Sequence, residues 1–343
     1  MKQKLLSIVK VLLFLSLGIF LIWISVSKLS SKDISDITNA LHNVRYGWII
    51  LSVFIGLISH VIRAIRWKML LEPLGHHPKL SNTFFAVMVG YLANYAMTRI
   101  GEATRCGILS RYENIPFAES FGTVIVERII DVLVFFLFII AMFILQFKTI
   151  YGYMQTSIFP IISAETNHFS SGKILFFVFI GVVFFALIIG IFVFRKKFKG
   201  AFFDKVKNIL KGFSGGLKSI RNIKKPFLFW FYSFFIWILY YLMLHVCFFS
   251  LDQTTNLTVP DILTVFIFGT FMVMLTPGGI GAYPFAMKQV LLLYGVNANI
   301  GYTLGWLTWL SQFGTILFFG LLSLILLAVL NKRKNGNNAT IGT

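Results

Sequence analysis

The chain is short of charged residues, and of acidic residues above all. Charged side chains make up 13% of its 343 residues, and Asp and Glu together number only 12. Typical soluble domains are about one-quarter charged. Here 57% of the residues are hydrophobic and the mean hydropathy is +0.83. This composition excludes an ordinary soluble protein and indicates an integral membrane protein.

Cysteine is also scarce, which narrows the possible chemistry. The two cysteines, Cys106 and Cys247, lie in or beside apolar runs and lack metal-ligand spacing. Neither a disulfide framework nor a metal centre is therefore expected. The glycines around residue 279 follow no strand pattern and lack the lysine and hydroxyl of a nucleotide-binding loop. We expect no metal and no other cofactor.

Positive charge is the one kind of charge that is plentiful. The chain has 31 Lys and Arg and a net charge of +19. On a soluble protein this excess would suggest nucleic acid as a partner. Here the basic residues gather between apolar runs, where they indicate membrane orientation and contact with anionic head groups. Nucleic acid is not an expected partner.

The apolar runs predict the fold class. A helix needs about 20 residues to cross the hydrocarbon. We expect an all-α, polytopic integral membrane helix bundle, as one domain over 1–334 with a disordered tail over 335–343. The first apolar run is interpreted as a retained signal anchor because no cleavage site ends it. Six full spans are expected, at 5–26, 47–70, 129–147, 173–194, 226–250 and 302–330.

The loop 195–225 sets the predicted orientation. It holds eleven Lys and Arg against one acid, so the positive-inside rule makes it cytoplasmic, together with both termini. The expected location is the bacterial inner membrane. Within this loop, apolar residues recur every three or four positions, which predicts an interfacial amphipathic segment over 198–222. A solvated basic linker is the alternative interpretation.

Two further apolar pieces cannot cross the membrane once without contradicting this orientation. The piece 82–112 begins and ends on the cytoplasmic side, and 262–295 begins and ends outside. We therefore predict two re-entrant helical hairpins, in inverted relation. Interrupted segments in corresponding places of two halves are typical of a transporter's substrate site.

The first hairpin carries charges at a spacing of three residues. Arg99, Glu102 and Arg105 would share one helix face, with Asn94 hydrogen-bonding the turn. Two guanidinium groups suit a phosphate, and Glu102 would hold one of them in place. The alternative is an internal ladder of ion pairs that closes the hairpin.

Charges in the neighbouring spans suggest a compensated polar cluster. Arg63 lies deep enough in its span to need a protein carboxylate or a phosphate, whereas Arg66 is equally well interpreted as reaching for head groups. Glu127 and Asp131 lie one helical turn apart, with Arg128 between them. Pairing to arginine, a proton relay and acid–base chemistry all remain open for these acids.

The second hairpin is interrupted by Pro277 and by three glycines, Gly278, Gly279 and Gly281. Amides freed by such a break can bind an anion, although a plain helix–turn–helix connection is the alternative. Lys288 follows in the returning arm and is the candidate for an additional cation that faces the cavity.

Together these motifs resemble the flippase-like domain family, which comprises the transmembrane region of lysylphosphatidylglycerol synthase and its stand-alone relatives. The resemblance implies re-entrant elements and translocation of lipid between leaflets. Thr98, Pro284 and Gln312 depart from the family pattern. The large synthetase domain is missing, so aminoacyl transfer from tRNA is not expected. The motifs are Arg63-x-x-Arg66-Trp67, Asn94 with Arg99-x-Gly101-Glu102-x-x-Arg105, Glu127-Arg128-x-x-Asp131 and Pro277-Gly-Gly-Ile-Gly281.

The sequence thus predicts a flippase rather than an enzyme. Its expected substrate is an anionic, phosphate-bearing lipid, either phosphatidylglycerol-type or polyprenyl-phosphate-linked, which crosses the bacterial inner membrane. A lipid-modifying enzyme that uses Glu102, Glu127 or Asp131 as a base is one alternative. A scaffold for an envelope complex is another. Gly314 and Gly320 would allow either helix packing within one chain or a homo-oligomer.

Overall fold

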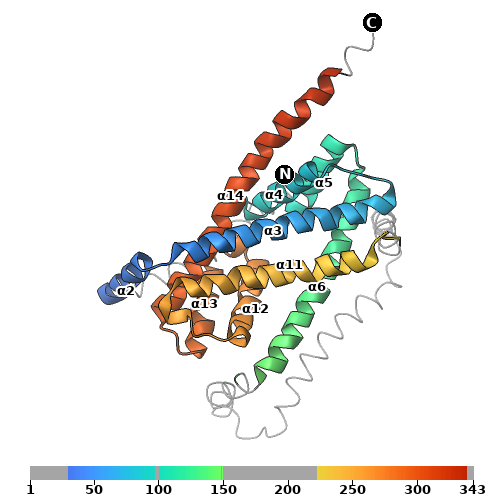
Figure 1. The fold of residues 1–343 in the computed structure, drawn as a ribbon. Helices are drawn as coiled ribbons and strands as arrows, with labels where there is room; N and C mark the ends of the chain where they lie inside the picture. The colour runs from blue at the N-terminus through green and yellow to red at the C-terminus, as the bar shows by residue number, and fades with distance from the viewer. Residues whose placement is uncertain (1–29, 97–99, 148, 150–221, 338–343) are drawn as a thin grey trace, which may run out of the picture. The chain divides into compact units, whose positions relative to one another are not determined.

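The computed structural model describes residues 30–96, 100–147, 149 and 222–337 (Figure 1). Within these ranges every regular element is a helix, so the predicted all-α class is confirmed. The α-helices are α2 (Ser31–His42), α3 (Tyr46–Leu71), α4 (Leu80–Ala96), α5 (Gly101–Glu113), α6 (Phe117–Leu145), α11 (Pro226–Cys247), α12 (Val259–Leu275), α13 (Ala282–Leu293) and α14 (Ala298–Asn337). Short 3-10 helices are η1 (Glu72–Leu74), η4 (Phe248–Ser250), η5 (Asp252–Thr254) and η6 (Pro277–Gly279).

Four of the described helical segments are long and apolar enough to cross a membrane. They are Tyr46–Leu74, Phe117–Leu145, Pro226–Ser250 and Ala298–Asn331. They match the expected spans 47–70, 129–147, 226–250 and 302–330, and they make the chain a polytopic helical membrane protein. The expected spans 5–26 and 173–194 lie outside the described residues, as does the amphipathic segment 198–222 except for its last residue.

Two helix boundaries differ from those expected. Helix α6 begins at Phe117 rather than at residue 129, because the polar residues near its start lie inside the helix and are compensated there by arginines. Helix α14 continues to Asn337. The first residues of the expected tail, 335–343, are therefore helical, and the rest of the tail lies outside the described residues.

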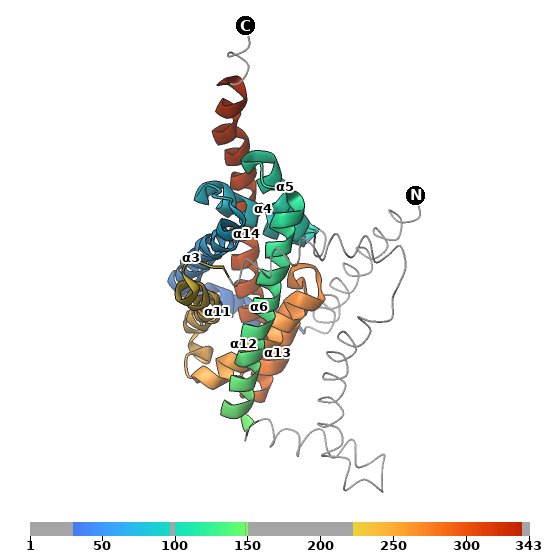
Figure 2. The same ribbon diagram turned by 90° about the vertical axis from the view of Figure 1, so that its right-hand side faces the viewer.

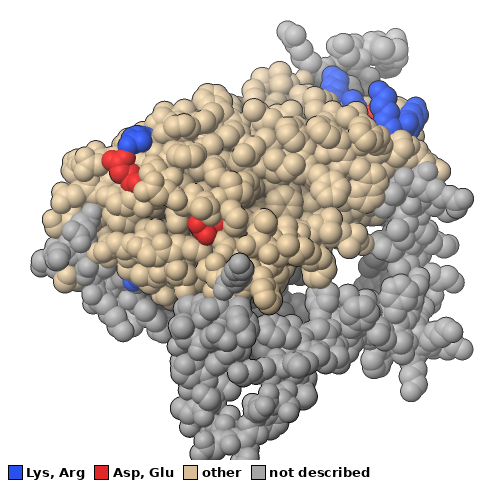
Figure 3. Space-filling model, turned by 60° about the horizontal axis from the view of Figure 1, so that its bottom comes forward, with Lys and Arg blue, Asp and Glu red and all other residues tan. Residues whose placement is uncertain are grey.

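The surface of the four apolar helices is rich in exposed hydrophobic side chains. Ile144 on α6 is 72% exposed, and Phe318 and Ile325 on α14 are 63% and 61% exposed. On the face drawn in Figure 3, Lys and Arg lie toward two opposite ends, with a broad area that lacks them between the two ends. Apolar surface of this extent requires lipid or another partner, as expected of membrane spans.

Helix α13 packs along the first part of α14 in the opposite direction. A Cβ atom at Gly305 would lie 2.7 Å from the Cα of Pro284, and one at Gly301 would lie 3.3 Å from the Cβ of Leu291. Pro284, near the start of α13, thus lies beside Gly305, whereas Leu291, near the end of α13, lies beside Gly301, which comes earlier in α14. The hairpin formed by α12, η6 and α13 therefore runs from the start of α14 toward its middle (Figures 1 and 2).

Helix α4 packs along the later part of α14, also in the opposite direction. Asn82 and Asn331 exchange hydrogen bonds between their amides, both of 3.1 Å, and Gly320 lies against Leu92. The hairpin formed by α4 and α5 thus runs from the far end of α14 toward its middle. The two hairpins approach each other from opposite ends of one long helix.

The tips of the two hairpins meet beside Trp309. The ring of Tyr95, at the end of α4, lies so close to Gly278 that a Cβ atom there would be 2.3 Å from the ring. The indole Nε1 of Trp309 donates a 2.7 Å hydrogen bond to the carbonyl oxygen of Gly278. Phe313 stacks on Trp309 and contacts Tyr95 edge to face. Position 278 requires glycine because a side chain would clash with the ring of Tyr95 and because its φ is 61°.

The two arms of the first hairpin touch through backbone. A Cβ atom at Gly101, at the start of α5, would lie 2.0 Å from the carbonyl oxygen of Gly90 in α4. The hairpin also packs on α3 and α6 through a core centred on Trp67, which is fully buried among Ala86, Leu109 and other apolar side chains. Gly101 therefore allows the backbones of α4 and α5 to approach each other closely.

We expect Gly101→Ala to destabilise the hairpin by about 1–3 kcal/mol, because a methyl group in the space of a backbone carbonyl forces the two helices apart. Gly107→Ala in the same helix is the matched control, since its Cβ would meet nothing within 4 Å. This control should be neutral or stabilising by up to about 1 kcal/mol. Thermal unfolding in detergent measures both variants, and equal Tm values would contradict the close contact.

Candidate functional site: a buried arginine–carboxylate cluster

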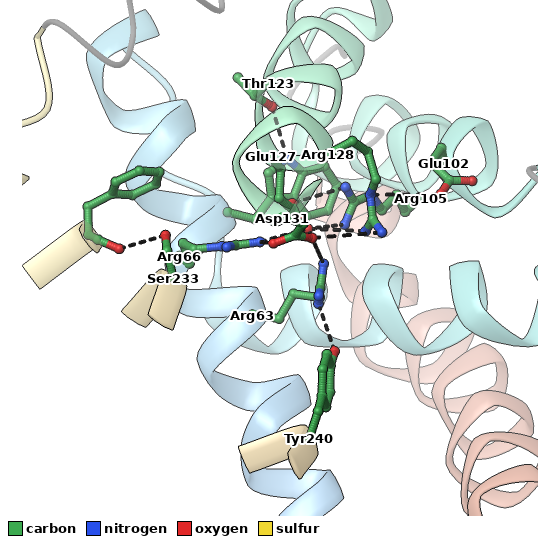
Figure 4. A network of polar contacts seen from close by, with 12 residues as sticks. Arg63, Arg66, Glu102, Arg105, Thr123, Glu127, Arg128, Asp131, Ser233 and Tyr240 are labelled. Carbon is green, nitrogen blue, oxygen red and sulfur yellow. Dashed lines mark hydrogen bonds and ion pairs between the residues drawn. The ribbon is translucent and has the colours of Figure 1, made fainter. Parts of the chain in front are cut away.

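Helices α3, α5 and α6 bring together four arginines and two acids. Helix α3 supplies Arg63 and Arg66, α5 supplies Arg105, and α6 supplies Arg128, Glu127 and Asp131. We call these six residues the arginine cluster. Figure 4 shows their guanidinium groups converging on the two carboxylates from different helices. The cluster is almost completely withdrawn from solvent, except at Arg128, whose side chain is 39% exposed.

Glu127 is the centre of the cluster. Its side chain is fully buried, and its Oε1 accepts from the Nη1 of Arg63 at 2.5 Å. Its Oε2 accepts from the Nη2 of Arg105 at 3.0 Å, and the Nη2 atoms of Arg66 and Arg128 lie 3.3 and 3.2 Å from Oε1. One carboxylate therefore joins all four arginines, and with them three helices.

Asp131 forms the second anchor, one turn later on α6. The Nη2 of Arg66 donates to its Oδ1 at 2.7 Å, and the Nη1 of Arg63 donates to its Oδ2 at 2.9 Å. Arg128 adds a longer contact of 3.8 Å between Nη1 and Oδ2. Arg63 and Arg66 are thus each shared between both acids, which fixes the rotation of α3 against α6.

Aromatic side chains complete the walls of the cluster. The guanidinium of Arg105 lies 4.5 Å from the centre of the Trp67 ring, and Trp67 in turn donates to the Oγ1 of Thr123. The Nε of Arg63 donates to the Oη of Tyr240 at 3.2 Å, and Tyr240 shares a 3.2 Å hydrogen bond with Tyr91. Ring faces stabilise cations that have lost their water.

Positive charge is in excess in the cluster. Glu102 is the nearest further acid, with its Oε1 3.9 Å from the Nε of Arg128. Even with Glu102 included, four guanidiniums face three carboxylates. Several donors also lack a hydrogen-bond partner among the described residues, namely the Nε and Nη1 of Arg66 and the Nε atoms of Arg105 and Arg128. Buried donors without acceptors are costly, and an anion supplies both the acceptors and the charge.

A small hollow opens beside the cluster, between α4, α5 and α6. Its lining includes Tyr91, Asn94, Glu102, Arg105 and Arg128, and its volume is about 10 Å³. That is roughly the space of one water molecule. The hollow is therefore too small to hold a phosphate group.

The structure brings five residues proposed from the sequence together, Arg63, Arg105, Glu127, Arg128 and Asp131. The described contacts join Arg105 to Glu127 and Glu102 to Arg128, whereas the expected pairing of Glu102 with Arg99 involves a residue outside the described part of the chain. Helix α5 starts at Gly101, and Arg99 lies outside the described residues, so its predicted role stays a prediction. Asn94 accepts a 2.8 Å hydrogen bond from the amide of Gly101.

The proposed residues of the second hairpin lie elsewhere. Gly278 and Gly279 form the tip that meets Tyr95, and Gly281 precedes α13 with a φ of 69°. Lys288 lies on α13, where its Nζ is 6.0 Å from the ring centre of Tyr302 on α14. None of these residues contacts the arginine cluster in the described part of the chain.

Some residues of the site were missed or left undecided from the sequence. Arg66 was interpreted equally as reaching for head groups, yet it is fully buried and bonds to Asp131. Tyr91 and Tyr240 were not proposed at all. A tyrosine inside an apolar span is a usable signal, because its hydroxyl needs a partner when it is buried. The described residues contain no cluster of three or more ligands that would hold a metal.

Comparison with known proteins places these observations in a family. The model of the lysylphosphatidylglycerol synthase TM region matches residues 7–320. The chain is 31% identical over 123 residues to a UPF0104 membrane protein of Methanocaldococcus jannaschii, which is 35% of this chain and 36% of that protein. It is 26% identical over 102 residues to the glycosyltransferase AglD of Haloferax volcanii, 29% of this chain and 16% of that protein. Both matches span only a minor part of the relative's length. No solved structure matches the chain.

Proposed function

This chain belongs to the family of the lysylphosphatidylglycerol synthase transmembrane region, and we propose that it moves an anionic, phosphate-bearing lipid between the leaflets of the membrane. The observation that carries the proposal is the excess of positive charge in the buried arginine cluster. One guanidinium remains uncompensated among the described residues. A phosphodiester brings one negative charge and several acceptor oxygens, so it satisfies the cluster without leaving a charge unbalanced.

The exposed edge of the cluster suggests which arginines meet the lipid first. Arg128 is partly exposed and lines the hollow together with Arg105. Both have an Nε atom without a hydrogen-bond partner in the described structure. Arg63 and Arg66 lie behind them, bonded to both acids. We assign first contact with the phosphate to Arg128 and Arg105, and charge balance at depth to Arg63 and Arg66.

The hairpins offer a way to alternate access. They approach from opposite ends of α14 and meet at Tyr95 and Gly278, which is the arrangement expected of two re-entrant elements that enter from opposite faces. In the proposed cycle, the closed tips form a barrier between the two sides. Outward movement of α4 and α5 enlarges the hollow for the phosphate, and separation of the tips then releases the head group. The lipid tails remain in the bilayer throughout.

Lipid modification, the rival function, is less well supported by the same geometry. A general base must be within reach of the proton it takes. Glu127 and Asp131 already accept hydrogen bonds from two or more arginines each. The similarity to AglD covers 16% of that protein, and only its name refers to glycosyl transfer. Mass spectrometry of lipid incubated with the purified protein distinguishes the two functions, since a flippase leaves the lipid mass unchanged.

Transport in liposomes tests the proposal. We expect wild-type protein to move fluorescent phosphatidylglycerol to the outer leaflet faster than fluorescent phosphatidylcholine. Arg128→Gln should lower transport of phosphatidylglycerol at least tenfold, because it removes a partly exposed donor and one positive charge. The readout is the fraction of fluorophore quenched by an impermeant reductant.

Arg111→Gln is the matched control for this experiment. Arg111 is an exposed arginine on α5 that lies over the ring of Tyr112, away from the cluster. Its removal changes the net charge of the protein by the same amount, so transport should stay near the wild-type rate. Equal loss in both variants, or no head-group preference in the wild-type protein, argues against the assigned site.

A further inference from the structure

A second, larger pocket lies at the other end of α3 from the arginine cluster. Its volume is about 380 Å³, which falls in the usual range of small-molecule sites of about 300–1,000 Å³. Arg45, which precedes α3, lies beside it, and Arg63 follows roughly 27 Å farther along the helix. The pocket is thus separate from the cluster, and it lies at the end that charge predicts to be external.

Three separate elements hold the pocket open. Asn39 on α2 lines one wall, and α2 packs against α14. Asp252 and Gln253 of η5 line another wall, where Arg45 forms an ion pair with Asp252 and its amide donates to Ser250 at 2.9 Å. Asn297 lines the third wall, just before α14. The pocket is therefore formed by contacts between segments that lie far apart in the sequence.

The lining is polar but nearly neutral. Four of the lining residues carry carboxamides, namely Asn39, Asn43, Gln253 and Asn297. Two of these amides also bond to backbone, because Asn43 donates to the carbonyl of Asn39 and Asn297 accepts from the amide of residue 299. The single acid among the lining residues, Asp252, is paired with Arg45. A lining without net charge does not select an anion or a cation. Carboxamides both donate and accept hydrogen bonds, as hydroxyl groups also do.

Apolar side chains contribute the remaining lining. Leu251 is 1% exposed and Ile300 is 8% exposed, and both line the pocket with Ala40. A ligand with hydroxyl groups along its edge and C–H groups on its face satisfies both kinds of surface. Glycerol and sugar rings have this character, whereas a bare phosphate does not.

We propose that this pocket binds the neutral, hydroxyl-rich part of the lipid head group, a glycerol or a sugar ring. The inference rests on the proposed translocation and narrows its substrate class to lipids whose phosphate or glycerol backbone carries such a group. The arginine cluster then recognises the phosphate charge, and the pocket, at the other end of α3, recognises the hydroxyl groups of the head group.

Binding of a free sugar to the protein in nanodiscs of phosphatidylcholine tests the pocket directly. The probe is methyl α-glucoside, detected by saturation-transfer NMR. We expect at least fivefold weaker sugar binding in Asn39→Leu and in Gln253→Leu, because each change replaces a carboxamide with an apolar side chain of similar size. Neither side chain forms a hydrogen bond with the described residues, so folding should persist. Gln289→Leu, an exposed glutamine on α13, is the control and should bind as wild type does.

The nanodisc lipid identifies the source of the occupant. Adding phosphatidylglycerol or a monoglucosyl lipid to the bilayer should displace the free sugar if the pocket holds a head group. Unchanged binding with both lipids would mean that the pocket takes free sugars, which overturns the proposal. Absence of sugar binding, or equal binding in all the variants, overturns it as well.

The same experiment separates this proposal from the proposed function. Arg128→Gln should bind the sugar normally while it transports lipid poorly, because the cluster and the pocket are far apart. If transport still depends on Arg128 but the pocket binds no sugar, only the proposed role of the pocket is refuted. Transport that does not depend on Arg128 refutes the role of the cluster, whatever the pocket binds.

Discussion

Glu127→Gln is expected to destabilise the folded protein by about 3–5 kcal/mol, the cost of leaving buried charges without their partner. Glu127 is fully buried and lies within hydrogen-bonding or ion-pair distance of all four arginines of the cluster. The amide of glutamine keeps the size of the side chain but removes the negative charge and replaces one acceptor with a donor. Whichever carboxylate oxygen the NH2 group replaces, at least one guanidinium then faces a donor instead of an acceptor. We expect a Tm lower by roughly 10 °C or more.

Glu102→Gln is the matched control for this change. Glu102 is partly exposed, and its carboxylate lies 3.9 Å from Arg128, so its charge is worth little to stability. The double variant Glu127→Gln with Arg105→Gln should recover part of the loss, because it removes one of the unpaired cations. Thermal unfolding of the wild type, Glu127→Gln, Arg105→Gln and the double variant gives the coupling energy between the two residues. A Glu127→Gln protein as stable as Glu102→Gln would show that the carboxylate does not hold the cluster.

The sequence was sufficient to predict that a polar cluster exists. Glu127 and Asp131 are spaced to share one helix face, and a chain with only 12 acids places both of them near arginines. The sequence did not predict which arginine pairs with which acid. Arg105 bonds to Glu127 rather than to Glu102 because the packing of α5 on α6, around the buried Trp67, decides which carboxylate it meets. Such packing depends on contacts that local spacing does not encode.

The amide-lined pocket was equally beyond sequence reasoning. Its walls come from Asn39, Gln253 and Asn297, which are far apart in the chain and belong to no motif. The interruptions of the two hairpins were visible as glycines and prolines, but their meeting at Tyr95 was not. A turn signal reports the local backbone, whereas the meeting of two turns depends on how each hairpin packs along α14.

Gly278→Ala is expected to lower lipid transport at least tenfold in protein that still folds. The added methyl group would lie 2.3 Å from the ring of Tyr95, so the two hairpin tips cannot close as they do here. Gly278 also has a φ of 61°, which adds backbone strain of order 1 kcal/mol for alanine. If the closed tips are a required state of the transport cycle, loss of their contact interrupts the cycle at this step.

Gly295→Ala separates the strain from the contact. Gly295 has a φ of 76°, but its Cβ would meet nothing within 4 Å. This variant therefore carries a similar backbone penalty without touching a hairpin tip, and it should transport lipid nearly as well as wild type. The liposome assay measures both variants, and detergent-extracted protein analysed by size exclusion confirms that each is folded.

Tyr95→Ala removes the other partner of the contact between the hairpin tips. On its own it removes the ring that seals the tip against Gly278, so transport should fall or lose its preference for the phosphate lipid. Combined with Gly278→Ala, it makes room for the new methyl group and should recover the stability lost in Gly278→Ala. Transport should stay low in this double variant, because the seal itself is gone. Full transport by the double variant would show that the contact between Tyr95 and Gly278 is only packing, and that the barrier between the two sides lies elsewhere along α14.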